Sequence, residues 1–161
     1  MEQEIYITPS PYDNLLLRNE GGELVEISFF RSKKIDDGER KPAFASIRKW
    51  LDEYFAGLNP SWRPYYRLKV RSDFQKEVSD ILLTIPYGET LIYGEIASLI
   101  AKRRGIREMS SQAVGGAVGR NPLVILIPCH RVIGANGKMV GFHGGLNNKI
   151  ALLALEKKIS L

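Results

Sequence analysis

The sequence predicts an α+β protein in which a small N-terminal antiparallel sheet with a helix precedes a mostly helical C-terminal domain containing a winged-helix-like helix-turn-helix. Apolar and polar residues alternate over residues 5–30, as they do in strands with one buried face. Apolar residues then recur at helical spacing over residues 44–55, and further helical signals follow one another after residue 67.

The N-terminal part is expected to form two or three short strands and one amphipathic helix. Turn-forming pairs interrupt the alternating segment at Ser10-Pro11, Asp13-Asn14 and Gly21-Gly22, which favours strands joined by tight turns. The helix should end before Gly57 and Pro60 and pack on the sheet. Its apolar stripe consists of Phe44, Ile47, Trp50, Leu51, Tyr54 and Phe55.

A connector is expected between the two halves of the chain. Pro60 and Pro64 flank Trp62 and restrict the backbone there. We therefore place the boundary near Arg67, with a sheet-and-helix subdomain at residues 1–66 and a second domain at residues 67–161.

Three consecutive helices are expected at the start of the second domain. Asp73 can cap the first helix, which should keep its period to Ile85 and end at Pro86-Tyr87-Gly88. The next should run from about Tyr93 to Lys102. After a turn that contains Gly105, Ser110 or Ser111 caps the last, which should run from Gln112 to Gly119.

The last of these helices has an unusual composition and charged surroundings. Glycine costs roughly 1 kcal/mol in a helix relative to alanine, so the three glycines at 115, 116 and 119 indicate close helix packing or backbone contact with a ligand. A turn between two helices fits a helix-turn-helix whose last helix enters a DNA groove. The arginines around it could meet phosphates or form a solvated basic face: Arg103, Arg104, Arg107 and Arg120.

Composition restricts the function classes. The net charge of +5 would favour polyanions, although solubility alone explains such a charge equally well. Neither a membrane-spanning run nor a signal peptide is evident, so we expect a soluble cytoplasmic protein. One cysteine excludes an intramolecular disulfide, and with two histidines it supplies too few ligands for a structural zinc site.

The most informative segment is residues 121–134, an apolar run that breaks at Pro128 and delivers Cys129 at a strand or turn edge. A thiolate is a nucleophile whose formation needs a nearby base or positive charge, and His130 and Arg131 come next in sequence. A lone cysteine in an apolar run is otherwise a small buried hydrophobe. His130 could equally be a core histidine, and Arg131 could brace the turn through backbone carbonyls.

The segment Pro128-Cys129-His130-Arg131-Val132-Ile133 resembles the active-site motif of the O6-alkylguanine-DNA alkyltransferases. The resemblance covers nearly the whole chain and is strongest from about Phe74 to Glu156. Its further motifs are Ile85-Pro86-Tyr87-Gly88-Glu89, Thr90-Leu91-Ile92-Tyr93, Ala113-Val114-Gly115-Gly116-Ala117, Arg120-Asn121-Pro122 and Gly144-Gly145-Leu146.

The resemblance implies five catalytic residues. Cys129 would accept the alkyl group, His130 would act through a water molecule as the base, and Glu156, in a helix from Lys149 to Lys158, would orient His130. Without the resemblance, Glu156 would be an ordinary solvent-facing glutamate. Asn121 would tie the active-site turn to the recognition element, unless it caps a helix. Tyr93 would hydrogen-bond the departing guanine, unless it is a core aromatic.

The resemblance also implies residues that contact DNA or the extruded base. Backbone around Val132 and His143 would line the guanine pocket, and Phe142 stands where many relatives carry a tyrosine. Gln112 stands where many relatives carry an arginine that replaces the extruded nucleotide; without a guanidinium, we expect weaker DNA affinity or altered base flipping. The full set is Gln112, Ala113, Gly115, Arg131, Val132, Phe142 and His143.

The expected function is direct, irreversible transfer of an alkyl group from O6 of guanine, or O4 of thymine, in double-stranded DNA to Cys129. Neither a cofactor nor a metal is required, and a monomer is expected. A non-catalytic module that recognises alkylated bases is the alternative, although such relatives replace the acceptor cysteine. A Cys-His hydrolase also has the right residue types, but it gives the helix-turn-helix no purpose.

Overall fold

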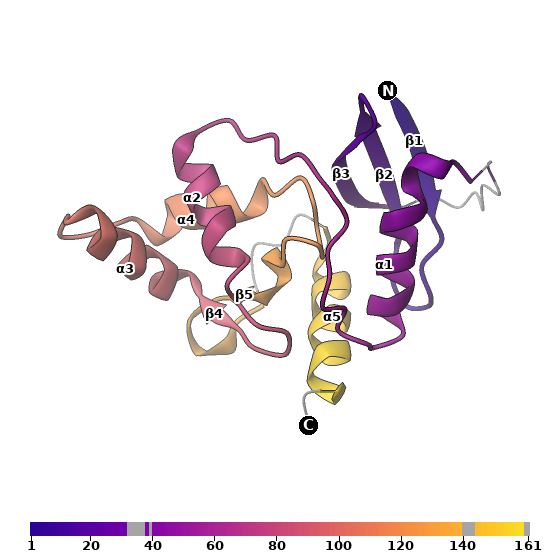
Figure 1. Cartoon of the computed structure of the whole chain (residues 1–161). Coiled ribbons are helices and arrows are strands. Elements are labelled where there is room, and N and C mark those ends of the chain that lie inside the picture. Colours follow the sequence, from indigo (N-terminus) through magenta and orange to yellow (C-terminus); the bar gives the residue numbers. More distant parts are fainter. Residues whose placement is uncertain (32–37, 39, 140–143, 160–161) are drawn as a thin grey trace.

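The computed structural model describes residues 1–31, 38, 40–139 and 144–159 (Figure 1). It is an α+β fold, as predicted, in which a three-stranded antiparallel sheet is followed by helices. The strands are β1 (Glu2–Tyr6), β2 (Asn14–Glu20), β3 (Glu23–Phe30), β4 (Leu91–Ile92) and β5 (Val132–Ile133). The α-helices are α1 (Ala45–Phe55), α2 (Asp73–Leu82), α3 (Tyr93–Arg104), α4 (Ser111–Gly119) and α5 (Leu146–Ile159).

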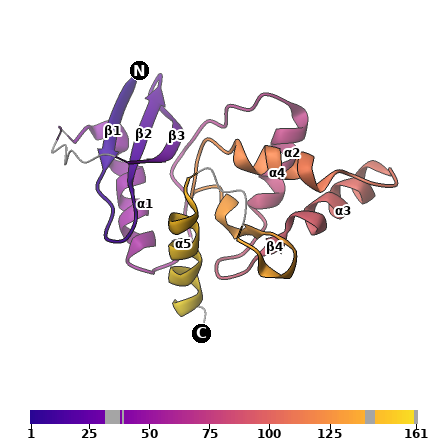
Figure 2. The same cartoon turned by 180° about the vertical axis from the view of Figure 1, so that it is seen from behind.

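The N-terminal sheet has the order β1-β2-β3, and its alternating sequence gives it one buried face. Every second residue of β2 is buried, and Leu15 and Leu17 are fully so. Helix α1 lies beside this sheet in Figures 1 and 2 and buries most of the predicted apolar stripe. Phe44 is buried in the 3-10 turn just before α1, and Phe55 is partly buried. The segment therefore forms strands and a helix for the reason expected from the sequence, which is burial of one face of each.

Helix α2 starts and ends differently from the expectation. Its N-cap is Ser72, whose side chain accepts a hydrogen bond from Gln75 N at 3.1 Å, whereas Asp73 is the first helical residue. The helix ends at Leu82 rather than at Ile85. A residue before proline is disfavoured in the α conformation, and Ile85 precedes Pro86, which explains the earlier end.

Helices α3 and α4 pack against each other, and glycine ends the first of them. Gly105 has φ +65°, a conformation that L side chains rarely adopt, and it caps α3 two residues later than expected. Ser110 is the N-cap of α4, because its hydroxyl accepts a hydrogen bond from Ala113 N at 3.1 Å. That this pair acts as a helix-turn-helix stays a prediction.

The apolar run before Cys129 is a buried series of turns rather than a strand. Leu123 forms a single bridge to Ile27 of β3, and the backbone then turns at Ile125, which has φ +70° and is 2 % exposed. Cys129 begins a short 3-10 helix that ends at Arg131 and leads into β5. Of the two alternatives, a strand edge or a turn edge, the structure has the turn.

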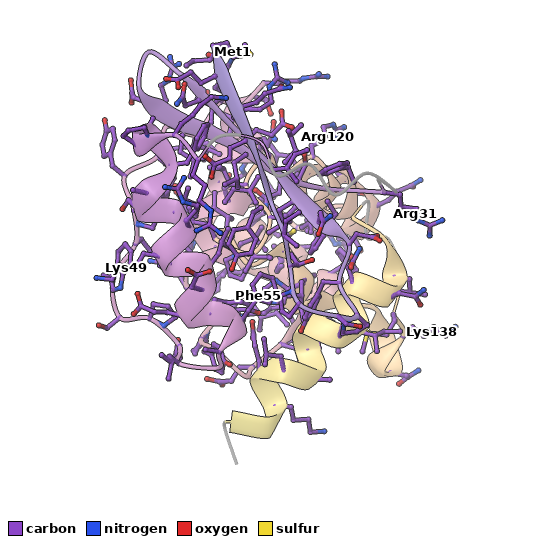
Figure 3. The ribbon with its side chains drawn as sticks, turned by 90° about the vertical axis from the view of Figure 1, so that its right-hand side faces the viewer. Met1, Arg31, Lys49, Phe55, Arg120 and Lys138 are labelled. Carbon is purple, nitrogen blue, oxygen red and sulfur yellow. The ribbon has the colours of Figure 1, made fainter. Side chains whose placement is uncertain are left out.

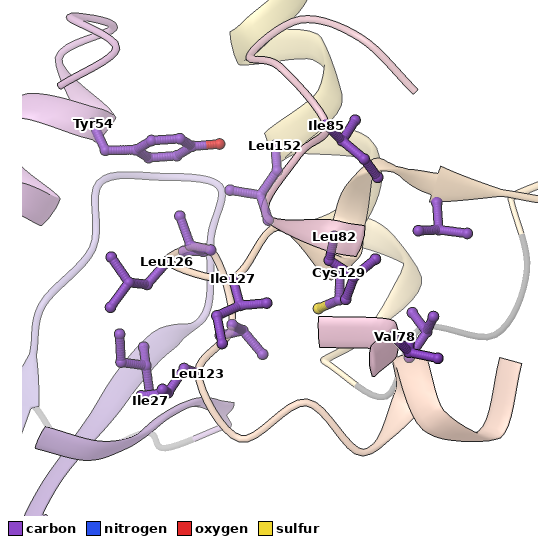
Figure 4. Close-up of a cluster of buried hydrophobic side chains, with 14 of the residues drawn as sticks. Ile27, Tyr54, Val78, Leu82, Ile85, Leu123, Leu126, Ile127, Cys129 and Leu152 are labelled. Atoms are coloured by element: carbon purple, nitrogen blue, oxygen red, sulfur yellow. The ribbon is translucent and has the colours of Figure 1, made fainter. Parts of the chain in front are cut away.

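The two halves share one hydrophobic core. Cys129, 3 % exposed, lies in it among apolar side chains that include Leu82 and Ile127 (Figure 4). Helix α5 begins at Leu146, three residues before the predicted Lys149, and contacts the N-terminal half directly. The division at residue 67 stays a prediction.

Tyr12 of the N-terminal half contacts both α5 and α1. Tyr12 donates a hydrogen bond to Ala151 O at 3.0 Å, and its ring lies 4.8 Å from that of Phe55. Figure 3 shows the molecule from the side of the N-terminal half, with Phe55 labelled at the end of α1. Within the described ranges, the structure has no helix that is both long and apolar enough to cross a membrane.

Candidate active site

Cys129 is held at the start of its 3-10 turn by its own backbone. Its N–H donates to Ile127 O at 2.7 Å, and Arg131 N donates to Pro128 O at 3.0 Å, so the turn is closed on both sides of the thiol. Burial raises the pKa of Cys129 to about 11, although a hydrogen bond with Asn121 and the charge of Lys149 act in the opposite direction. The thiol is therefore protonated at neutral pH.

His130 lies beside Glu156, far along the chain, and both side chains are buried. His130 Nε2 is 2.6 Å from Glu156 Oε2, with the residues 0 % and 1 % exposed. Burial lowers the pKa of His130 despite the carboxylate, so the imidazole is neutral near pH 7. Because a carboxylate can only accept, we assign the imidazole proton to Nε2. Within the described part of the chain, His130 Nδ1 is buried without a hydrogen-bond partner.

Arg131 completes this cluster, because all three nitrogens of its guanidinium donate hydrogen bonds. Its Nε donates to Glu156 Oε1 at 2.8 Å, its Nη2 to Glu156 Oε2 at 3.1 Å and its Nη1 to Ile85 O at 2.7 Å. Burial acts to raise the pKa of Glu156, but the hydrogen bonds from His130 and Arg131 and the charge of Arg131 outweigh it and hold that pKa well below its usual range.

This arrangement bears on two expectations. Glu156 is not solvent-facing, and it lies where it can orient His130. The Arg131 side chain braces the turn, one of the two roles considered for it, and it is only 8 % exposed. Because all three guanidinium nitrogens of Arg131 already donate hydrogen bonds within the protein, the geometry does not favour a direct DNA contact by this side chain.

Asn121 closes the loop that precedes Cys129. Its Nδ2 donates to Ile127 O at 2.7 Å, and its Oδ1 accepts from Leu123 N at 3.0 Å. The C-cap of α4 is Arg120, so Asn121 is not the cap considered as an alternative. The side chain thus ties the end of α4 to the segment that carries the thiol.

Lys149 is a buried cation next to the thiol, and sequence reasoning missed it as a site residue. It is 0 % exposed, its Nζ donates to Val132 O at 2.5 Å, and it lies 5.9 Å from the centre of the Tyr93 ring. Burial lowers the pKa of Lys149, while the negative charge of a Cys129 thiolate acts to raise it. A lysine three residues after the start of a helix looks like a surface residue in the sequence, so only its fully buried position identifies it.

Tyr93 stands between Lys149 and α4. It is the first residue of α3 and is half-buried, and burial followed by the charge of Cys129 raises its pKa. A Cβ added to Gly115 would lie 3.8 Å from its ring, so α4 approaches this ring closely. The structure therefore brings Gly115 and Lys149 to the ring of Tyr93, and a role of these residues in a base pocket stays a prediction.

A cavity of about 120 Å³ opens beside the thiol. It lies between β3 and the end of α4, so both halves of the chain form its walls. Its lining residues are Ser28, Phe29, Val118, Gly119, Asn121, Val124, Cys129 and Gly144. The predicted base-pocket residues Phe142 and His143 lie outside the described residues.

Comparison with known proteins gives one consistent answer. Residues 73–158 match the family model described as 6-O-methylguanine DNA methyltransferase, DNA binding domain. The methylated-DNA–protein-cysteine methyltransferases of Mycobacterium leprae and Methanosarcina barkeri are 41 % and 42 % identical to this chain. The matches cover 92 % and 94 % of this chain and 88 % and 95 % of those proteins. The chain belongs to the O6-methylguanine DNA methyltransferase family.

Solved structures of this methyltransferase family agree with the fold. Mycobacterium tuberculosis OGT in complex with DNA matches with a TM-score of 0.77 and 41 % identity, covering 95 % of this chain and 91 % of that one. The Methanococcus jannaschii O6-methylguanine DNA methyltransferase matches with a TM-score of 0.64 and 31 % identity, covering 96 % and 93 %. The similarity thus includes the N-terminal half, which the family model does not reach.

The remaining predicted residues of this methyltransferase family member lie on the first turn of α4. Gln112 and Ala113 are exposed there. Of the arginines near this helix, Arg104 is paired with Glu77 at 2.7 Å, and the guanidinium of Arg120 would be 3.2 Å from a Cβ added to Gly116.

Within the described residues, no group of three or more histidines, cysteines or acidic residues could hold a metal ion.

Proposed function

We propose that this protein repairs DNA by moving a methyl or other small alkyl group from O6 of guanine directly to Cys129. One observation carries the proposal: the chain's single cysteine begins a turn whose next residue, His130, is held by a buried carboxylate and keeps Nδ1 without a partner among the described residues. This pairing of thiol, imidazole and carboxylate belongs to a chain of the methyltransferase family.

His130 supplies the base for the first step. Because Nε2 is occupied by Glu156, only Nδ1 can take a proton, and a water molecule between it and Cys129 would relay the thiol proton. The thiol pKa of about 11 means that the free protein holds little thiolate. Lys149 would stabilise the negative sulfur as it forms, since opposite charges interact strongly where water is excluded.

The transfer step then follows. The thiolate sulfur attacks the alkyl carbon, a new S–C bond forms, and the C–O6 bond breaks with its electron pair passing to the guanine. Tyr93 would donate a hydrogen bond or proton to the departing base. The thioether that remains does not hydrolyse readily, so each molecule acts once.

DNA is expected to meet the first turn of α4. The reacting atom of a paired base is hidden in the duplex, so the base must be extruded at a cost of a few kcal/mol. Gln112 and Ala113 are exposed on that turn, and Gly115 lies deeper, beside Tyr93. Val132 would contribute the pocket wall through its backbone. We place the protein with its DNA in the cytoplasm and expect it to act as a monomer.

The test is the mass of the intact protein after mixing with double-stranded DNA that contains O6-methylguanine. We expect wild type to gain one methyl group, mapped to Cys129, and Cys129→Ser to gain none; unmethylated DNA is the control. If the protein binds the methylated DNA without any mass change, it is a damage-recognition module instead.

A further inference from the structure

Glu156 also receives a hydrogen bond from a third side chain, which the proposed mechanism does not use. Tyr54 of α1 donates its phenol proton to Glu156 Oε2 at 2.5 Å, and it is 1 % exposed. The same oxygen faces His130 Nε2 at 2.6 Å. A residue of the N-terminal half therefore shares an acceptor atom with the imidazole next to the thiol.

The aromatic packing of α1 aims the Tyr54 hydroxyl at this oxygen. Its ring stacks on Trp50 with centroids 5.5 Å apart and an interplanar angle of 13°, and Trp50 is itself fixed by a 2.8 Å hydrogen bond from its Nε1 to Trp62 O. Phe55 meets the ring edge-on at 5.5 Å, and His130 does so at 6.5 Å. Rotating Tyr54 away would disrupt all of these contacts, so the hydroxyl stays where it is.

We propose that Tyr54 is a positioning residue for the transfer reaction, whose hydroxyl shares Glu156 Oε2 with His130 and so weakens the hold of the carboxylate on the imidazole proton. This inference rests on the proposed function. An O–H···O⁻ hydrogen bond is among the strong ones, and it draws negative charge away from the oxygen that His130 also uses. His130 then stays neutral, with Nδ1 ready to take the thiol proton.

Other charged and titratable groups also face Glu156 and His130. From the 3-10 turn, Arg131 binds both carboxylate oxygens, and from α5, the charge of Lys149 disfavours a protonated His130. Gly88 N donates to Glu156 Oε1 at 3.2 Å. The phenols of Tyr12 and Tyr87 both feel the charge of Glu156, which contributes to raising their pKa values. None of these groups is altered when only the Tyr54 hydroxyl is removed.

Replacing Tyr54 by phenylalanine removes the hydroxyl and leaves the ring. Without the competing donor, the Glu156 carboxylate stabilises a doubly protonated His130 more strongly through Nε2–H. The pKa of His130 therefore rises by up to about one unit, the scale of one charge-assisted hydrogen bond. Since the base must be neutral to work, the fall in single-turnover transfer rate on the acid side should move to higher pH by the same amount. The rate at neutral pH should change much less than the rate on the acid side of the profile.

The matched control is Tyr6→Phe. Tyr6 also lies in the N-terminal half, is 8 % exposed and donates to a carboxylate, Asp52 Oδ1, at 2.6 Å. Its loss should lower the unfolding temperature by a similar amount and leave the pH profile of transfer as in wild type. A general loosening of the N-terminal half would move both variants alike.

A second readout does not depend on transfer. The chain has two histidines, and the NMR signal that disappears in His130→Gln identifies His130. Its midpoint of titration should rise in Tyr54→Phe and not in Tyr6→Phe. If wild type transfers no methyl group, the proposed function fails, but this titration still reports on Tyr54.

A third variant covers the case in which Tyr54→Phe does not fold. Placing 3-fluorotyrosine at position 54 keeps the ring and makes the phenol a stronger donor, so the acid-side fall in rate should move to lower pH. Shifts of opposite sign in the two variants support the inference. An unchanged His130 titration in either one, or an equal loss of rate at every pH, overturns it.

Discussion

Replacing Arg131 by methionine should destabilise the protein strongly, because it leaves the Glu156 carboxylate buried without its cation. The two side chains are 9 % and 1 % exposed, so little water is available to solvate the charge that remains. Breaking such a buried pair costs about 3–5 kcal/mol. For a chain of 161 residues, this corresponds to a fall in unfolding temperature of about 6–20 °C.

A double-mutant cycle in urea separates the ion pair from simple loss of packing. Glu156→Gln removes the charge and keeps the shape, and the double variant Arg131→Met/Glu156→Gln contains neither charge. We expect the double variant to lose about 1–3 kcal/mol less than the sum of the single losses. Additive losses, or a loss below about 1 kcal/mol in Arg131→Met, would refute the bracing role and favour the DNA contact that the resemblance suggested.

The effect should also depend on pH in a defined direction. The pKa of Glu156 is lowered by folding, so its contribution to stability is present above its ordinary value of 4.5 and is lost as the pH falls toward the folded value. Because Arg131 contributes to that lowering, the variant lacks part of this contribution. The difference in free energy of unfolding between wild type and Arg131→Met should therefore narrow below about pH 4.5.

Two further predictions concern the thiol and the DNA. Lys149→Met removes the cation that lowers the Cys129 pKa, so the single-turnover rate with O6-methylguanine DNA should fall about tenfold or more at pH 7, and the loss should shrink only as the pH approaches the thiol pKa of about 11; an unchanged rate at pH 7 would contradict the electrostatic role. Gln112→Arg adds a cation on the exposed first turn of α4, so DNA affinity should rise and its dependence on salt should steepen by about one counterion; unchanged affinity and unchanged base flipping would show that the glutamine is not a weakness.

The sequence was sufficient for those parts of the fold that depend on local patterning. The alternation in β2 and the stripe on α1 each specify a buried face, and both elements form where predicted. The apolar run before Cys129 has the composition of a strand, but its backbone turns at Ile125 because Asn121 closes the loop on itself. That closure depends on a side-chain hydrogen bond, which periodicity does not reveal.

The site shows the same division between local and long-range information. Cys129 and His130 were identified from adjacent residues, and Glu156 by resemblance. Tyr54 and Lys149 were not identified, because each looks ordinary in its own helix: one as a core aromatic, the other as a surface cation. Their importance comes from packing against segments distant in the sequence, such as Val132 for Lys149.

The backbone of Ile125 limits how the segment before Cys129 can be redesigned. A positive φ in a β-branched residue costs about 1–3 kcal/mol, which glycine would relieve. Removing a fully buried aliphatic side chain costs about 2–5 kcal/mol, however, so glycine would lose more than it gains. Position 125 therefore opposes a change to glycine, and enlarging the pocket for bulkier lesions is better attempted on α4, where the Val118 side chain lines the cavity in regular helix.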